Sequence, residues 1–144
     1  MSTLISDNIK GRGDAKVVNV FAGHATDSTR TTNLEQGLAK LSIKFNGASA
    51  TAAEDSTGVS HSFNVASLVD VSTGRYKINI NNDMTDGDYA ISHAVSPDGS
   101  GQSDLAPMID STNTPAAGSF NVMSVRASFF DSTIICCSVH GDLL

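Results

Sequence analysis

Four histidines and two adjacent cysteines are the residues of this chain best suited to metal binding or covalent catalysis: His24, His61, His93, His140, Cys136 and Cys137. None of the histidines lies in an H-x-H or H-E-x-x-H motif, and the chain has no Cys-x-x-Cys pair. Cys136 and His140 would share one face of a strand, but a tetrahedral zinc site needs further ligands. The sequence therefore predicts no catalytic site, no metal site and no cofactor.

The position of each cysteine and of His93 also points to a structural role. Neighbouring side chains of a strand point to opposite faces, so a disulfide between Cys136 and Cys137 is not expected. His93 falls on the inward register of its predicted strand, and we expect a hydrogen-bonded histidine of the core or of an interface rather than a catalyst. Serines are too abundant for a nucleophilic site to be inferred from a serine and a histidine alone.

Two short motifs have a functional and a plain interpretation. The acidic segment 83–88 offers carboxylates that suit a hard cation such as calcium, but it lacks the spacing of an EF-hand loop. Turn formation by Asp and Gly explains it more simply. The tripeptide Arg12-Gly13-Asp14 matches an integrin-binding motif, and we interpret it as a turn in an N-terminal arm.

Length and composition predict one mostly β domain. The chain has 144 residues, 40% of them hydrophobic, which is enough for a single core. Only 17% are charged, and this scarcity of Lys and Glu removes the best helix formers from the surface. The net charge of −6 argues against a nucleic-acid partner. No apolar run is long enough for membrane insertion, and the N-terminus lacks a signal-peptide hydrophobic region, so we expect a soluble protein made in a cytoplasm.

The first thirty residues show no helical period and are predicted to form an extended N-terminal arm, with one short strand at 16–21. Thr32-Asn33-Leu34-Glu35 is typical of a capping box, so one short helix is expected from there to Leu38. Leu34 and Leu38 would point the same way from that helix.

From residue 31 the chain is predicted to form a β-sandwich or barrel-like domain that extends to residue 144. Leu41, Ile43 and Phe45 alternate with polar residues in the clearest strand, and segment 62–81 is typical of an antiparallel hairpin. Segment 48–59 fits either an edge strand or a loop, and the polar stretch 96–118 is expected to be an exposed, functional loop. Strands are expected at 39–45, 62–69, 76–80, 89–95, 120–125 and 133–139, a spacing of about ten residues that indicates an antiparallel all-β fold.

Four ordered segments carry a family resemblance: LAKLSIKFNG, HSFNVASLVDVSTGRYKINI, MTDGDYAI and STIICCSVHGD. Together they resemble the β-rich domain of bacteriophage tail-fibre and virion structural proteins, found in podoviruses and myoviruses of marine bacteria and cyanobacteria. The resemblance covers about residues 32–144, and the opening STLISDNIKGRG is similar to the N-terminal lead of such proteins. It implies a non-enzymatic virion protein of the fibre type, assembled as a homotrimer in the host cytoplasm.

In such a protein the arm 1–30 would dock on other virion proteins, and the β domain would project and contact a host-surface glycan. Leu34 and Leu38 would then be contacts at the trimer axis, or alternatively part of the core of their own subunit. The alternatives are a capsid-surface decoration protein and a carbohydrate-binding β-sandwich module. For the module, two tyrosines and no tryptophan are a poor aromatic platform. A glycan-degrading enzyme is the least favoured, because the acidic residues lie mostly in turns.

Overall fold

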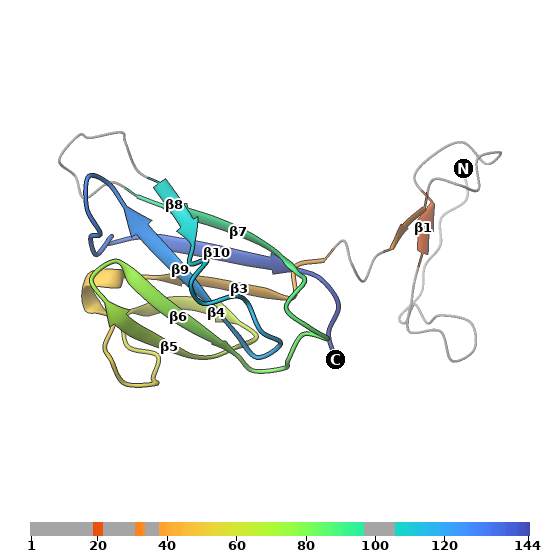
Figure 1. Cartoon of the computed structure of the whole chain (residues 1–144). Coiled ribbons are helices and arrows are strands. Elements are labelled where there is room, and N and C mark those ends of the chain that lie inside the picture. Colours follow the sequence, from red (N-terminus) through yellow and green to blue (C-terminus); the bar gives the residue numbers. More distant parts are fainter. Residues whose placement is uncertain (1–18, 22–30, 34–37, 97–105) are drawn as a thin grey trace, which may run out of the picture. The chain divides into compact units, whose positions relative to one another are not determined.

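The computed structural model describes residues 19–21, 31–33, 38–96 and 106–144 (Figure 1). The chain divides into two units, Met1–Leu38 and Ala39–Leu144, so the division falls on the C-terminal side of the expected boundary between residues 30 and 31. In the first unit, β1 (Asn19–Phe21) pairs antiparallel with β2 (Thr31–Asn33). The predicted strand 16–21 contains β1. Of the predicted helix, the opening residues Thr32 and Asn33 lie in β2, and residues 34–37 lie outside the described part.

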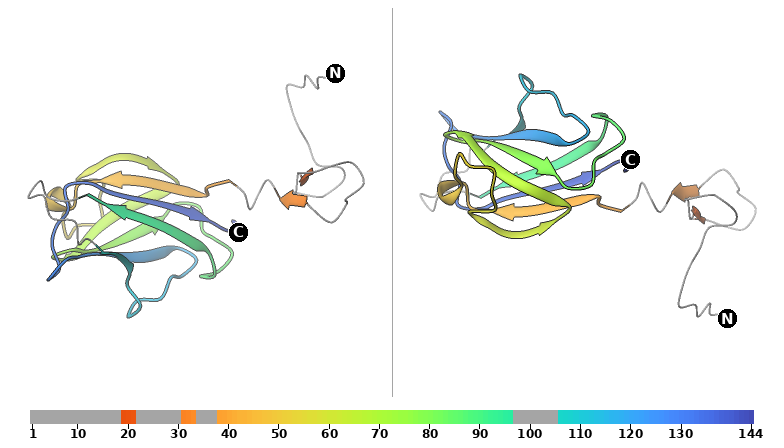
Figure 2. Two further views of the ribbon diagram at one scale, coloured as in Figure 1. Left: turned by 90° about the horizontal axis from the view of Figure 1, so that it is seen from above. Right: turned by 90° about the horizontal axis from the view of Figure 1, so that it is seen from below.

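The second unit is an all-β sandwich of two antiparallel four-stranded sheets, as the sequence predicts (Figure 2). One sheet has the order β4-β3-β10-β7 and the other β5-β6-β9-β8. We call them the thiol sheet, because β10 carries both cysteines, and the groove sheet. The strands are β3 (Leu41–Phe45), β4 (Val59–Phe63), β5 (Val65–Ser72), β6 (Arg75–Ile80), β7 (Ala90–Val95), β8 (Ala106–Ile109), β9 (Ser119–Val125) and β10 (Ile135–His140).

The core lies between the two sheets and is built from alternate residues of each strand. Leu41, Ile43 and Phe45 are buried on β3, which confirms the clearest strand of the sequence. Tyr76, Ile78 and Ile80 are buried on β6 in the predicted alternation. The other core side chains are Leu68, Met84, Phe120, Val122, Ile135, Cys137 and Val139.

The predicted strand 62–69 is wrong as one continuous strand. Its residues belong to two strands, β4 and β5, which lie in different sheets and are separated by Asn64 with a positive φ of 58°. Beyond that change of sheet a bulge shifts the register again, so Leu68 is buried in place of Val69. Phe63 is 57% exposed on the outer side of β4. The hairpin itself is confirmed, because β5 pairs antiparallel with β6 across a turn at Gly74.

The predicted loop 96–118 needs a correction too, because Ala106–Ile109 forms strand β8 at the edge of the groove sheet. Segment 48–59 overlaps the 3₁₀ turn η1 (Gly47–Ser49) at its start and joins β4 at its end. Asn46 caps this turn by accepting a hydrogen bond from the Ala48 amide. A Cβ at Gly47 would overlap the Tyr76 hydroxyl, which is why glycine stands there.

The chain enters the sandwich at β3 and ends at the same end of it, beyond β10 (Figure 1). The opposite end carries η1 and the segment between β9 and β10. No helix in the described part of the chain is long and apolar enough to cross a membrane.

Candidate functional site

Some of the residues expected to be functional lie outside the described part of the chain: His24, Leu34 and the tripeptide 12–14. Leu38 is described and is 54% exposed, at the last residue of the first unit. Because Leu34 is outside the described part, the expected contact of Leu34 and Leu38 at a trimer axis stays a prediction.

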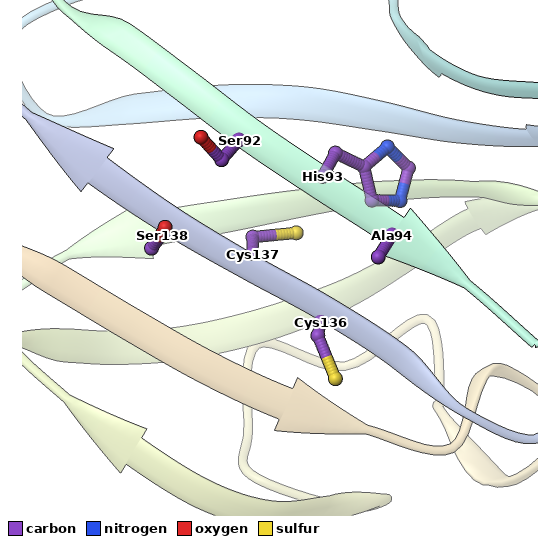
Figure 3. Close-up of a pocket in the computed structure, with 6 residues that line it drawn as sticks. All are labelled: Ser92, His93, Ala94, Cys136, Cys137 and Ser138. Carbon is purple, nitrogen blue, oxygen red and sulfur yellow. The ribbon is translucent and has the colours of Figure 1, made fainter.

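The cysteines and histidines of the thiol sheet fall on its two faces (Figure 3). Cys136 and His140 share the outer face of β10, as the strand period predicts, and both are half-buried. Cys137 points into the core, directly opposite His93 of β7. Sequence reasoning did not find the neighbouring positions of Cys137 and His93, because they depend on a pairing between strands about 45 residues apart.

His93 is inside the sandwich but is not hydrogen-bonded as expected. Both ring nitrogens are buried and neither has a hydrogen-bond partner among the described residues. Burial lowers the pKa of His93 to about 4, and the nearby backbone of Met108 opposes that shift only in part. The imidazole is therefore neutral at neutral pH and destabilises the sandwich when protonated.

Cys137 and Ser42 are two possible nucleophiles of the thiol sheet, one on each face. Burial raises the pKa of the Cys137 thiol to about 12, so the reactive thiolate is scarce at neutral pH. On the outer face, Ser42 Oγ lies 3.3 Å from His61 Nε2. Among the described residues no carboxylate hydrogen-bonds to His61, so the third member that would orient the imidazole is missing from this pair.

On the outer face of the thiol sheet, strands β7 and β10 carry mostly small side chains. A shallow hollow of about 230 Å³ lies over β7 and β10, lined by Ser92, His93, Ala94, Cys136, Cys137 and Ser138 (Figure 3). The four strands of this sheet contain no Asp or Glu, although the chain as a whole is acidic. The face has too few polar groups in the hollow to hold a small ligand and suits contact with another surface.

The acidic turn 83–88 forms the link between β6 and β7. Asp86 Oδ1 accepts a hydrogen bond from the Asp88 amide, which is the turn chemistry expected of Asp. Met84 is fully buried and bridges to Leu143 near the C-terminus. No group of three or more potential metal ligands occurs among residues 38–96 and 106–144.

The second hollow is a polar groove of about 520 Å³ on the outer face of the groove sheet. Lys77 of β6 and Asn121 of β9 lie directly opposite each other on this face. The segment after β8 contributes hydroxyl and amide groups, and Val71 of β5 is exposed at the groove. The lining residues are Val71, Lys77, Thr112, Asn113, Thr114, Ser119 and Asn121.

Asp110 holds the segment after β8 in place. The carboxylate is 2% exposed and accepts hydrogen bonds from the amide and hydroxyl of Thr112 and from the side chain of Asn113. The Thr112 hydroxyl, above all, lowers the pKa of Asp110, and Arg75 at 4.0 Å adds to the effect. Asp110 therefore stays ionised and fixes the wall of the groove.

No protein-family model matches this chain, and searches of curated proteins and of solved structures found no similar protein. The resemblance to phage fibre proteins therefore rests on the sequence motifs alone.

Proposed function

We propose that this chain is a non-enzymatic, fibre-type structural protein of a tailed-phage virion, assembled as a homotrimer. The arm 1–30 docks it to other virion proteins, and the β domain projects and contacts the host surface. The sequence resemblance supports the virion location, and the all-β sandwich is a suitable fold for a projecting domain.

The observation that carries the assembly part of the proposal is the lack of charge on the edges of the thiol sheet. Neither edge strand, β4 or β7, contains a Lys, Arg, Asp or Glu. Monomeric proteins commonly protect such edges with charges, proline or a covering segment. The groove sheet has those protections: Pro107 lies on β8, and the Asp70 amide of β5 donates to the Thr51 carbonyl. The edge strands of the thiol sheet, β4 and β7, have neither charge nor proline, so we expect a second copy to cover them.

The exposed side chain of Phe63 also favours assembly through the thiol sheet. It is 57% exposed on edge strand β4 and stands opposite Ser42 on the outer face. An exposed Phe beside small, acid-free neighbours is a typical feature of a surface that becomes buried on assembly.

Labelling of purified phage particles tests the location. An antibody against residues 39–144 should decorate particles at discrete positions in electron micrographs, and the chain should co-purify with them in a fixed copy number. Particles that carry neither the label nor the chain would refute a virion role.

A carbohydrate-binding module is the second candidate, because the polar groove is large enough for a saccharide unit. The oligomeric state and the sugar affinity of the purified chain separate the two candidates. A stable trimer without sugar affinity supports the structural protein, and a sugar-binding monomer supports the module.

A further inference from the structure

The polar groove presents an amide side chain that has no partner among the described residues. Asn121 is only 9% exposed, yet its side-chain amide forms no hydrogen bond with any residue in the described ranges. The nitrogen and oxygen of this amide are not sealed from solvent, so they are open to a ligand in the groove. The side chain lines the groove, so a bound molecule can supply the missing partners.

The chemistry of the groove defines that molecule. An Asn amide offers a donor and an acceptor side by side, which matches a pair of neighbouring hydroxyl groups. Thr114 and Ser119 add two hydroxyls that form no side-chain hydrogen bond within the described chain. Val71 is the only apolar residue in the described lining, which suits a polar ligand better than an apolar or aromatic one.

Lys77 gives the groove a positive charge. Among the described residues that line the groove it is the only charged one. It stands opposite Asn121, with Cβ atoms about 5 Å apart in such pairs. Asp110 is buried beneath the wall, and its oxygens accept hydrogen bonds from Thr112 and Asn113. A single positive charge beside a hydrogen-bonding amide fits a ligand with hydroxyls and one carboxylate.

We propose that this groove binds a sugar unit that carries a carboxylate, as in an acidic polysaccharide. This inference deepens the proposed host contact and rests on that function. The Asn121 amide pairs with ring hydroxyls, and the Lys77 ammonium binds the carboxylate. The segment after β8, which Asp110 holds in place, closes one side of the groove.

Titration of the isotope-labelled full chain with tetragalacturonate, followed by NMR, tests the proposal. Resonances of the Asn121 side-chain amide should shift on binding. The methyl-esterified tetrasaccharide, which keeps the hydroxyls and loses the charge, should bind about tenfold more weakly. Added salt should weaken binding of the acid form.

Three variants test which residues bind the ligand. Lys77→Met should weaken binding about tenfold, whereas Lys44→Met, which removes an exposed lysine from the other sheet, should leave it unchanged. Asn121→Asp keeps the side-chain shape and adds a repelling charge, so it should abolish binding of the acid form. Unchanged melting temperatures would show that the variants fold.

Absence of any shift at Asn121, or equal binding by Lys77→Met, would overturn the proposal. Equal binding of a tetraglutamate peptide would do the same, because it would show a site for acidic peptide rather than for sugar. None of these results alters particle labelling, so failure of the groove assignment is distinguishable from failure of the virion role.

Discussion

The Tyr76 hydroxyl donates a hydrogen bond of 2.7 Å to Asp131 Oδ1, 55 residues later in the chain. The same carboxylate oxygen accepts a hydrogen bond of 2.6 Å from the Gly74 amide. Tyr76 is fully buried, and its ring packs edge-on against Phe45, with centroids 5.1 Å apart. Burial first, and then the Asp131 carboxylate, raises the pKa of Tyr76 far above its usual range. One carboxylate thus connects the β5–β6 turn and the core to the segment before β10.

Removing this hydroxyl should cost more stability than removing one bound to a neutral group. Tyr76→Phe should lower the free energy of unfolding by about 1.5–3 kcal/mol, because a hydrogen bond to a charged acceptor is lost in the interior. Tyr89→Phe is the matched control, since its half-buried hydroxyl donates to the neutral carbonyls of Ala116 and Ser119. Its loss should be about 1 kcal/mol. Urea unfolding measures both, and equal losses would contradict the special role of Asp131.

His93 should make the protein sensitive to mild acid. Its pKa is about 4 in the folded chain and 6.5 when unperturbed, so the unfolded state binds the proton first as pH falls. Above pH 6.5 neutral His93 imposes no protonation cost on the folded state. As the pH falls towards 4, the free energy of unfolding decreases by at most about 1.4 kcal/mol per pH unit.

The variant His93→Leu isolates this effect. It removes the unpaired nitrogens, so it should be at least as stable as the parent at pH 7 and clearly more stable at pH 5. His61→Leu, a change at an exposed histidine, should leave the pH dependence of the parent intact. Thermal melting from pH 7.5 to 4.5 measures the difference, and parallel curves for the parent and His93→Leu would contradict it.

The sequence predicted the fold class and most strands because their hydrophobic period is local information. The β3 and β6 alternations needed no knowledge of partners. The change of sheet at Asn64 was missed because Phe63, Val65 and Val69 keep a regular two-residue period through a backbone break. The groove was out of reach for another reason: Lys77 and Asn121 meet only through the long-range pairing of β6 with β9.

Phe63 provides a direct test of that corrected register. Phe63→Ala should change the free energy of unfolding by less than about 1 kcal/mol, because the ring is 57% exposed. Phe45→Ala should cost about 3–5 kcal/mol, because Phe45 is 1% exposed in the core. Chemical denaturation of the two variants decides the matter. A large loss for Phe63→Ala would show instead that the continuous strand expected from the sequence is right.

Deletion of residues 1–30 should separate folding from attachment. The sandwich core lies wholly within Ala39–Leu144, so the shortened chain should keep the melting temperature of the full chain. If the arm docks the protein, the shortened chain should not join the particle. Complementation of a phage that lacks the protein, followed by mass spectrometry of the particles, checks this. Normal incorporation would place the docking site in the sandwich.

The expected trimer would bury the uncharged edges of the thiol sheet and the two leucines before the sandwich. Leu38 is 54% exposed in the single chain, and its partner Leu34 lies four residues earlier. If both pack around a threefold axis, sedimentation equilibrium should give a mass near three times 14.9 kDa that persists on dilution. The double change Leu34→Asp and Leu38→Asp should then dissociate the trimer, because three copies of each charge would meet at the axis. Leu144→Asp, at a residue 86% exposed, controls for added charge and should stay trimeric. A monomeric parent chain would exclude the trimer, and a trimer that survives the double change would move the interface to the edges and outer face of the thiol sheet.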